Sequence, residues 1–260
     1  MDLPLMTLVA LACAALGAGF IDAVAGGGGL IQLPALFTAL PGAPAATVFG
    51  CNKAASIFGT ANAAWRYGRR VALPWRIALP ATAAAFVFSF SGAAAVAWLP
   101  KDWVRPLVLF LLLAVTAYTV LKPDFGRISG PALPSRHELS LALLAGAVIG
   151  FYDGFFGPGT GSFLIFIFIR LFGLDFLHAS AAAKVVNVGT NAAALAYFVP
   201  TGHVLWLLAL MMAAFNMLGS QLGARLALRH GSGFVRWVFL AVAVTLIFKF
   251  GIDTFRDLGA

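Results

Sequence analysis

Charged side chains are scarce in this chain of 260 residues. Only 10% of the residues are Asp, Glu, Lys or Arg, and Glu138 is the one glutamate. A soluble domain carries roughly 25% charged residues. Here 62% of the residues are hydrophobic, and the mean hydropathy is +0.96. A small globule cannot hide so much apolar surface from water. The composition excludes a soluble enzyme and a disordered protein, and it predicts an all-α polytopic membrane protein.

Cysteine is also rare. The two cysteines, Cys13 and Cys51, lie in apolar stretches and match neither a metal-binding spacing nor a disulfide framework. They are expected to be small packed side chains, and a secreted disulfide scaffold is excluded. The sequence also lacks a nucleophile with its base, as in a Ser-His-Asp or Cys-His arrangement. We therefore expect neither an enzyme nor a bound cofactor or metal.

Long apolar runs are what the chain has in abundance. They fall near 3–25, 30–40, 45–65, 76–98, 104–121, 139–156, 162–173, 179–199, 204–227 and 235–252. Most are about 17–25 residues long, enough for a helix to cross a hydrocarbon core of roughly 30 Å. The runs 30–40 and 162–173 are too short to cross unaided. Each follows a glycine-rich break, 26–29 or 157–161, that cannot continue a stable helix.

The chain repeats itself. A single shift of 131 residues, the separation of Asp22 from Asp153, aligns rare residue types without gaps. The aligned pairs include Asp22 with Asp153, Lys53 with Lys184, and Trp75 with Trp206. The pattern predicts an N-terminal repeat (1–121), a linker (122–138) and a C-terminal repeat (139–260). Internal duplication is how many membrane transporters are built.

Positive charges between the runs predict how the repeats are oriented. The link 66–76 holds four arginines and should be cytoplasmic, because Lys and Arg favour that side. Its counterpart around 197–207 has no Lys or Arg and should lie outside, whereas 122–138 is again basic. Equivalent links on opposite sides predict inverted repeats with both chain termini outside. Each short run then either crosses as a tilted half-helix or reverses at its glycine break, and the sequence leaves both open.

Four ionisable residues lie in or beside the apolar runs: Asp22, Lys53, Asp153 and Lys184. A charge at the bilayer centre costs at least about 2.5–3.5 kcal/mol, so these groups should face protein or water. One interpretation is structural, with two Asp–Lys pairs that hold the repeats together. In the other, the lysines attract an anion, while the aspartates hold the lysines or carry the protons that couple transport. The interpretations overlap, because paired charges can do both.

The glycine breaks let the main chain approach a ligand with no side chain in the way. The short helix after each break directs its N-terminal N–H groups and positive dipole end at that gap. Two such helix starts near mid-membrane would form an anion site, to which Thr160 and Ser162 add hydroxyl donors. Alternatively, glycines only permit close helix packing, which is the interpretation we favour for Gly219 and Gly223.

Amide side chains extend this polar surface. Asn52 precedes Lys53, while Asn187 and Asn191 follow Lys184 by three and seven residues, on one helix face. This face should look into a cavity, although amides in membranes also bond across helices. The candidate substrate-binding residues are Gly26, Gly27, Gly28, Gly29, Asn52, Lys53, Gly157, Gly159, Thr160, Gly161, Ser162, Lys184, Asn187 and Asn191, with Asp22 and Asp153 for coupling or charge pairing.

These segments resemble the TauE/SafE family of sulfite-exporter-like membrane proteins, and within it the YfcA-like subgroup. The resembling segments are 19–31, 52–53, 150–163, 184–187 and 219–225, so the resemblance covers essentially the whole chain. Such proteins usually carry Thr at the position of Cys51, so a hydroxyl near the site is replaced here. The resemblance implies a multi-pass permease of the bacterial inner membrane. In several members the solute is sulfite or an organosulfonate, moved generally outward.

We therefore expect an inner-membrane secondary transporter, an exporter of small anions such as sulfite or organosulfur anions. Its two inverted repeats should each hold a glycine-broken helix pair followed by three transmembrane helices. The expected partners are a small anionic solute and the lipid bilayer, with a homodimer left open. No nucleic acid is expected, since the net charge of +8 resides mostly in short links. The alternatives are a cation- or proton-coupled carrier, and a non-transporting scaffold or assembly factor with a dry repeat interface.

Overall fold

The computed structural model describes residues 3–98, 110 and 137–258, and within these ranges it contains helices and turns but no strand. The helices are α1 (Leu5–Ala25), α2 (Gly29–Ala39), α3 (Ala45–Gly68), α4 (Trp75–Ala97), α6 (Glu138–Phe155), α7 (Thr160–Phe172), α8 (Phe176–Phe198) and α9 (Trp206–Leu258). The all-α prediction is confirmed for the described residues. The predicted run 104–121 and most of the linker 122–138 lie outside them, so the repeat boundaries stay a prediction.

Four helical stretches are long and apolar enough to cross a membrane. They are Leu5–Ala25, Trp75–Ala97, Glu138–Phe155 and Trp206–Gly231. Helices α3 and α8 have comparable lengths, 24 and 23 residues, but they are less apolar because they carry the lysines and amides. The molecule thus combines apolar outer helices with two polar ones that pack against each other.

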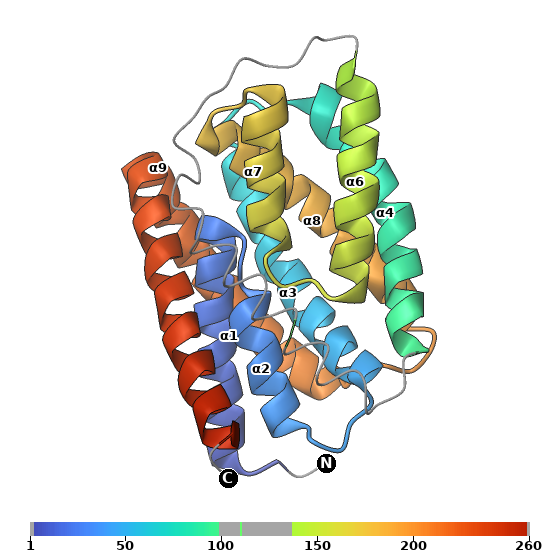
Figure 1. Ribbon diagram of the computed structural model, residues 1–260, viewed down its shortest axis with the longest axis vertical. Helices are drawn as coiled ribbons and strands as arrows, with labels where there is room; N and C mark the ends of the chain where they lie inside the picture. Colours follow the sequence, from blue (N-terminus) through green and yellow to red (C-terminus); the bar gives the residue numbers. More distant parts are fainter. Residues whose placement is uncertain (1–2, 99–109, 111–136, 259–260) are drawn as a thin grey trace.

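The chain reverses direction at each glycine break. Helix α1 ends at Gly26, whose φ of 83° lies in the left-handed region that favours glycine. After α6, Gly157 and Gly159 have φ values of 97° and 83°. In Figure 1, α2 returns beside α1, and α7 returns beside α6. The short runs form α2 and α7, and the chain reverses direction before each of them. Whether these short helices cross the membrane or end within it stays a prediction.

The helix contacts come in matched pairs. Helix α1 packs along α9 as α6 packs along α4, and α3 packs against α9 as α8 packs against α4. The 131-residue shift exchanges α1 with α6, α3 with α8, and α4 with the first part of α9. It therefore maps each of these contacts onto its counterpart, as expected of a duplicated sequence.

Small residues permit these close contacts. A side-chain carbon on Gly19 would lie within 3.0 Å of the backbone of Asn216, and one on Gly150 within 3.0 Å of the backbone of Ala85. The shift maps the first contact onto the second. Gly219 and Gly223 likewise face the backbones of Leu16 and Phe20. The packing interpretation of Gly219 and Gly223 is thus confirmed.

Both chain termini lie at the same end of the molecule (Figure 1). Helix α9 makes this possible because it bends sharply at Gly231, where φ is 69° and ψ is −163°. The part after Gly231 runs back toward the end at which the chain starts (Figure 1). The turn between α3 and α4 lies at the opposite end, as the charge pattern requires.

Candidate functional site

The two glycine breaks meet inside the molecule. A side-chain carbon on Gly26 would lie within 3.0 Å of the backbone of Gly161. Ser162 Oγ donates a hydrogen bond of 2.6 Å to the backbone oxygen of Ala25, which joins the start of α7 to the end of α1. Helices α2 and α7 therefore begin beside each other, as the anion-site hypothesis requires.

A small cavity of about 30 Å³ lies where the breaks meet α3 and α8. Its lining residues are Asp22, Gly26, Gly29, Asn52, Lys53, Ser56, Thr60, Asp153, Gly157, Thr160, Gly161, Asn187 and Asn191. A cavity of this volume holds about two water molecules. A larger solute requires the surrounding side chains or helices to move apart.

Two buried ion pairs cross between the halves of the chain. Lys53 Nζ lies 2.7 Å from Asp153 Oδ2, and Lys184 Nζ lies 3.4 Å from Asp22 Oδ2. The two lysine side chains are only 3% and 0% exposed. The 131-residue shift maps one pair onto the other. Both Asp–Lys pairs that the structural interpretation expects are present, and within each pair the lysine charge is balanced by a carboxylate.

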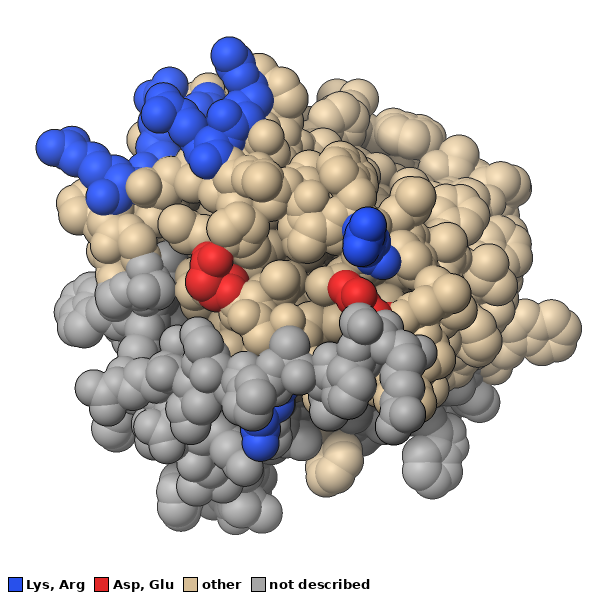
Figure 2. All heavy atoms as spheres, turned by 90° about the horizontal axis from the view of Figure 1, so that it is seen from above, with Lys and Arg blue, Asp and Glu red and all other residues tan. Residues whose placement is uncertain are grey.

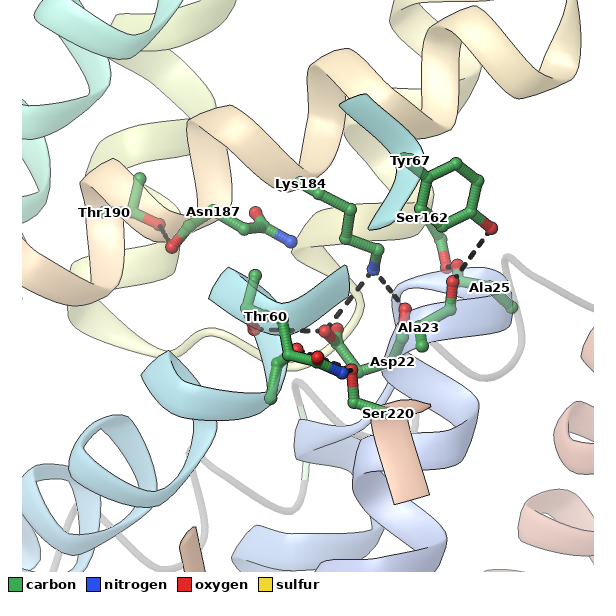
Figure 3. A network of polar contacts seen from close by, with 12 residues as sticks. Asp22, Ala23, Ala25, Thr60, Tyr67, Ser162, Lys184, Asn187, Thr190 and Ser220 are labelled. Atoms are coloured by element: carbon green, nitrogen blue, oxygen red, sulfur yellow. Dashed lines mark hydrogen bonds and ion pairs between the residues drawn. The ribbon is translucent and has the colours of Figure 1, made fainter. Parts of the chain in front are cut away.

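Donor side chains occupy the last carbonyl groups of α1 (Figure 3). Lys184 Nζ donates to the backbone oxygen of Asp22, Tyr67 donates to that of Ala23 at 3.1 Å, and Ser162 donates to that of Ala25. The C-terminus of a helix carries partial negative charge on such carbonyls. These donors therefore offset the negative end of α1 beside the cavity.

The N-termini of α2 and α7 are free of side-chain caps within the described residues. Gly29, the first residue of α2, and Thr160, the first residue of α7, both line the cavity. A helix N-terminus presents N–H donors and roughly half a positive charge. With the end of α1 occupied, the two helix N-termini add positive polarity at the cavity, which Asp22, Asp153 and Lys53 also line.

Two amide oxygens at the cavity lack a partner among the described residues. Asn52 Oδ1 and Asn187 Oδ1 are buried and accept no hydrogen bond there. Leaving a buried polar atom unpaired costs about 1–3 kcal/mol. The orientation of an amide is inferred from its hydrogen-bond network, so either end of each amide can face a bound solute. These groups are suited to bind a polar molecule.

Most, but not all, of the predicted residues reach the cavity. Five of them do not line it: Gly27, Gly28, Gly159, Ser162 and Lys184. Ser162 and Lys184 instead bond to α1. Sequence reasoning missed Ser56 and Thr60, which line the cavity from α3. The signal was available, because the 131-residue shift places Ser56 opposite Asn187 and Thr60 opposite Asn191.

The described part of the chain contains no candidate metal-binding site. There, no three His, Cys, Asp or Glu side chains gather so that they could hold a metal ion. Cys51 is fully buried, and its Sγ accepts a hydrogen bond of 3.2 Å from the backbone N–H of Leu205. Cys51 is a packed side chain, as expected from the sequence, whereas Cys13 is exposed on α1, so the same expectation is wrong for Cys13.

Known membrane transporters are similar to this chain over nearly its full length. The model of the family described as "Sulfite exporter TauE/SafE" matches residues 11–250. "Probable membrane transporter protein ORF9" of Sinorhizobium sp. is 36% identical over 97% of this chain and 95% of its own length. "Probable membrane transporter protein YfcA" of Escherichia coli K12 is 34% identical over 91% of this chain and 87% of its own. No solved structure matches.

Proposed function

The chain belongs to the sulfite exporter TauE/SafE family of membrane transporters, and we propose that it carries a small oxyanion, sulfite or an organosulfur anion, through the cavity between its glycine breaks. Its relatives are named as transporters and not as enzymes, and its apolar helices make it a multi-pass membrane protein. The observation that carries the proposal is the meeting of two uncapped helix N-termini, those of α2 and α7, at a buried polar cavity.

The choice of an oxyanion follows from the donors around the cavity. Backbone N–H groups at Gly29 and Gly161 can approach a solute closely because no side chain intervenes. The amides of Asn52 and Asn187 have unused hydrogen-bonding capacity beside them. A small oxyanion can accept hydrogen bonds from these backbone N–H groups. With each amide oriented so that its Nδ2 faces the solute, the anion accepts from the amides as well.

The ion pairs supply a means of coupling transport to protons. An oxyanion that arrives in the cavity competes with Asp153 for Lys53, because Lys53 and Asp153 both line the cavity. Two negative groups beside one lysine in a low-dielectric site cannot both remain ionised at low cost, so a carboxylate gains a proton. Binding of the anion and uptake of a proton are thereby linked, which makes the carrier a secondary transporter.

The fold supplies a means of alternating access. In the proposal, the hairpin of α1 and α2 and the hairpin of α6 and α7 belong to inverted repeats that meet at the cavity near mid-membrane. The matched contacts of α1 with α9 and of α6 with α4 support this assignment. Transporters of this type expose a central site to either side by rocking one repeat against the other. In this proposal, the transporter is located in the inner membrane of a bacterium.

A cation- or proton-coupled carrier is the second candidate, because both aspartates line the cavity and Lys184 does not. In that case a cation binds to Asp22 or Asp153, and the lysines are only counter-charges. A dry scaffold is disfavoured by the cavity itself and by the two unpartnered amide oxygens.

The proposal is tested by flux of radiolabelled sulfite into proteoliposomes, with sulfoacetate and sulfate as competitors. We expect saturable uptake that Asn187→Ala reduces by about tenfold, since a lost hydrogen bond to a charged solute is worth about 1.5–3 kcal/mol. Asn62→Ala is the matched control, because Asn62 also lies on a polar helix but bonds to Ser220 outside the cavity. Cation uptake that needs Asp22 or Asp153 without any bound anion supports the second candidate instead.

A further inference from the structure

A second pocket lies at one end of the molecule, at the end of α3 and beside α9. Five arginines line it, and we call it the arginine pocket: Arg66, Arg69, Arg70, Arg225 and Arg229. Its volume is about 850 Å³. Figure 2 looks onto this end of the molecule, where basic side chains gather in one patch. Within the described residues, it shares no lining residue with the central cavity.

No acidic side chain among the described residues forms an ion pair with the arginines of this pocket. The ion pairs among the described residues are Lys53 with Asp153, Lys184 with Asp22, and His178 with Asp175, and none includes an arginine of the pocket. Arg66 Nε is buried and has no hydrogen-bond partner in that part of the chain. Like charges so close together repel, so the arrangement calls for a bound anion.

An aromatic side chain helps to order the cluster. The guanidinium carbons of Arg66 and Arg69 lie 5.9 Å and 5.0 Å from the centre of the Trp65 ring. Such cation–π contacts orient guanidinium groups without neutralising them. The fork of N–H donors on each arginine remains available for a planar or tetrahedral oxyanion.

Packed apolar side chains separate this pocket from the central cavity. A buried cluster extends from Ala25, beside the first glycine break, to Tyr67 on α3 and Ala224 on α9. Val71 and Leu177 pack against this cluster and also line the arginine pocket. The arginine pocket is thus a site of its own in this conformation.

The volume of the arginine pocket and its positive charge indicate which kind of ligand it can bind. A volume of 850 Å³ is that of a pocket for a drug-sized molecule, whereas a single small oxyanion would leave most of the guanidinium groups unpaired. Arginine is favoured where phosphate is recognised. The pocket includes part of the link 66–76, for which the charge rule predicts the cytoplasmic side, where anionic lipids lie.

We propose that the arginine pocket binds a group that carries two or more phosphates, from the headgroup of an anionic phospholipid or from a soluble polyphosphate. The site is distinct from the path of the transported solute, so it serves to stabilise or regulate the carrier. It does not depend on which anion the central cavity accepts.

The test is the thermal unfolding midpoint of the full chain in detergent, measured with cardiolipin, with sodium pyrophosphate, or with phosphatidylcholine as the neutral lipid. We expect a saturable rise with cardiolipin or pyrophosphate and none with phosphatidylcholine. In the double variant Arg225→Gln/Arg229→Gln, the apparent affinity should fall roughly tenfold or more, since each lost charge-assisted bond is worth about 1.5–3 kcal/mol. A rise with cardiolipin alone identifies a lipid headgroup, and a rise with pyrophosphate alone identifies a soluble polyphosphate. A rise with both shows that the pair of phosphates is what the pocket recognises, whichever molecule carries it.

The matched control is Arg76→Gln/Arg170→Gln, which removes the same charge from exposed arginines outside the pocket. This control should bind like the wild type. Equal losses in both double variants, or no rise with either phosphate compound, would overturn the proposal. If Arg225→Gln/Arg229→Gln does not fold, the single variants Arg69→Gln and Arg225→Gln replace it, with the same comparison.

Discussion

At the scale of single residues, the central feature is the balance of charge beside the cavity. Lys53 and Lys184 are almost fully buried, and each is held by an aspartate from the other half of the chain. Four isolated charges would be too costly in this setting, whereas two pairs are tolerable. The sequence allowed the pairing, but only the folded arrangement of α1, α3, α6 and α8 shows which lysine meets which aspartate.

This pairing predicts an asymmetry between single and double substitutions. Asp153→Leu leaves Lys53 buried and unpaired, so it should destabilise the protein by about 3–5 kcal/mol. The double variant Lys53→Met/Asp153→Leu should recover most of that stability, because no lone charge remains. Thermal unfolding in detergent measures both. If the single and double variants are equally unstable, the unpaired charge of Lys53 is not the cause of the lost stability.

The same double variant separates stability from transport. It lacks the Lys53–Asp153 pair, which in the proposal couples anion binding to protons, so its sulfite flux in proteoliposomes should lose its dependence on a pH gradient. Flux that still responds to the gradient as in the wild type would assign coupling to other groups.

At the scale of helices, glycines set the distance between elements. Gly150 faces the backbone of Ala85 so closely that a methyl group cannot fit, whereas Gly17 has no atom of another described residue within 4 Å of its added carbon. Both glycines lie inside helices of similar length. The close approach of α4 and α6 therefore requires a glycine at position 150, whereas Gly17 of α1 faces open space.

Alanine substitution at these positions should have opposite effects. Gly150→Ala forces α4 and α6 apart and should lower the unfolding midpoint, because overpacking typically costs about 1–3 kcal/mol. Gly17→Ala should be neutral or stabilising by about 0.5–1 kcal/mol, since alanine is the better helix former. Unfolding midpoints in detergent decide this, and a destabilised Gly17→Ala would count against the packing account.

The N-terminus of α8 provides a prediction on pH. Asp175 caps this helix and accepts hydrogen bonds from the backbone N–H groups of Leu177 and His178 at 2.9 and 3.1 Å. Partial burial acts to raise the pKa of Asp175, but hydrogen bonds from His178 and Leu177 and the charge of His178 outweigh burial and lower the pKa below its ordinary value. A lowered folded-state pKa contributes stability above the unfolded pKa, and this contribution is lost as the pH falls through the folded pKa.

Asp175→Ala should therefore cost about 0.5–2 kcal/mol at neutral pH, the usual value of an N-cap. Its unfolding midpoint should approach that of the wild type in acid, where the wild-type carboxyl is protonated. Asp175→Asn is the control, because asparagine also caps helices but does not titrate. A constant difference between Asp175→Ala and the wild type across pH would show that ionisation of Asp175 plays no part.

At the scale of the whole molecule, the duplication explains both the fold and the site. Contacts, glycines and ion pairs all map onto their counterparts under one shift of the sequence. The repeat and both glycine breaks could be predicted because rare residue types recur in both halves at the same 131-residue shift. Ser56 and Thr60 were missed because their types differ from their counterparts Asn187 and Asn191, although their positions do not.

Other features depend on long-range packing that a single sequence does not encode. The hydrogen bond of Ser162 to Ala25 and the separation of Lys184 from the cavity arise only where α7 meets α1. The arginine pocket likewise joins residues of α3 and α9 that lie far apart along the chain. The positive-inside pattern predicted the side of the membrane but not this shared surface.

The proposed inverted arrangement predicts opposite accessibility of equivalent turns. With Cys13 and Cys51 replaced by alanine, single cysteines at Val71 and Gly202 report on the turn after α3 and the turn after α8. A membrane-impermeant thiol reagent added to whole cells should label the cysteine at 202 and not that at 71. Labelling of both or of neither would contradict inverted repeats.

The central claim, that α2 and α7 together form an oxyanion site, is tested most directly by equilibrium binding of radiolabelled sulfite to the purified protein. The account predicts one bound anion per chain, displaced by sulfoacetate. Ser56→Ala and Asn187→Ala should weaken it to a similar degree, because the two residues are counterparts at the cavity. Binding that is absent for each of these anions, or that is unchanged in both variants, would contradict it.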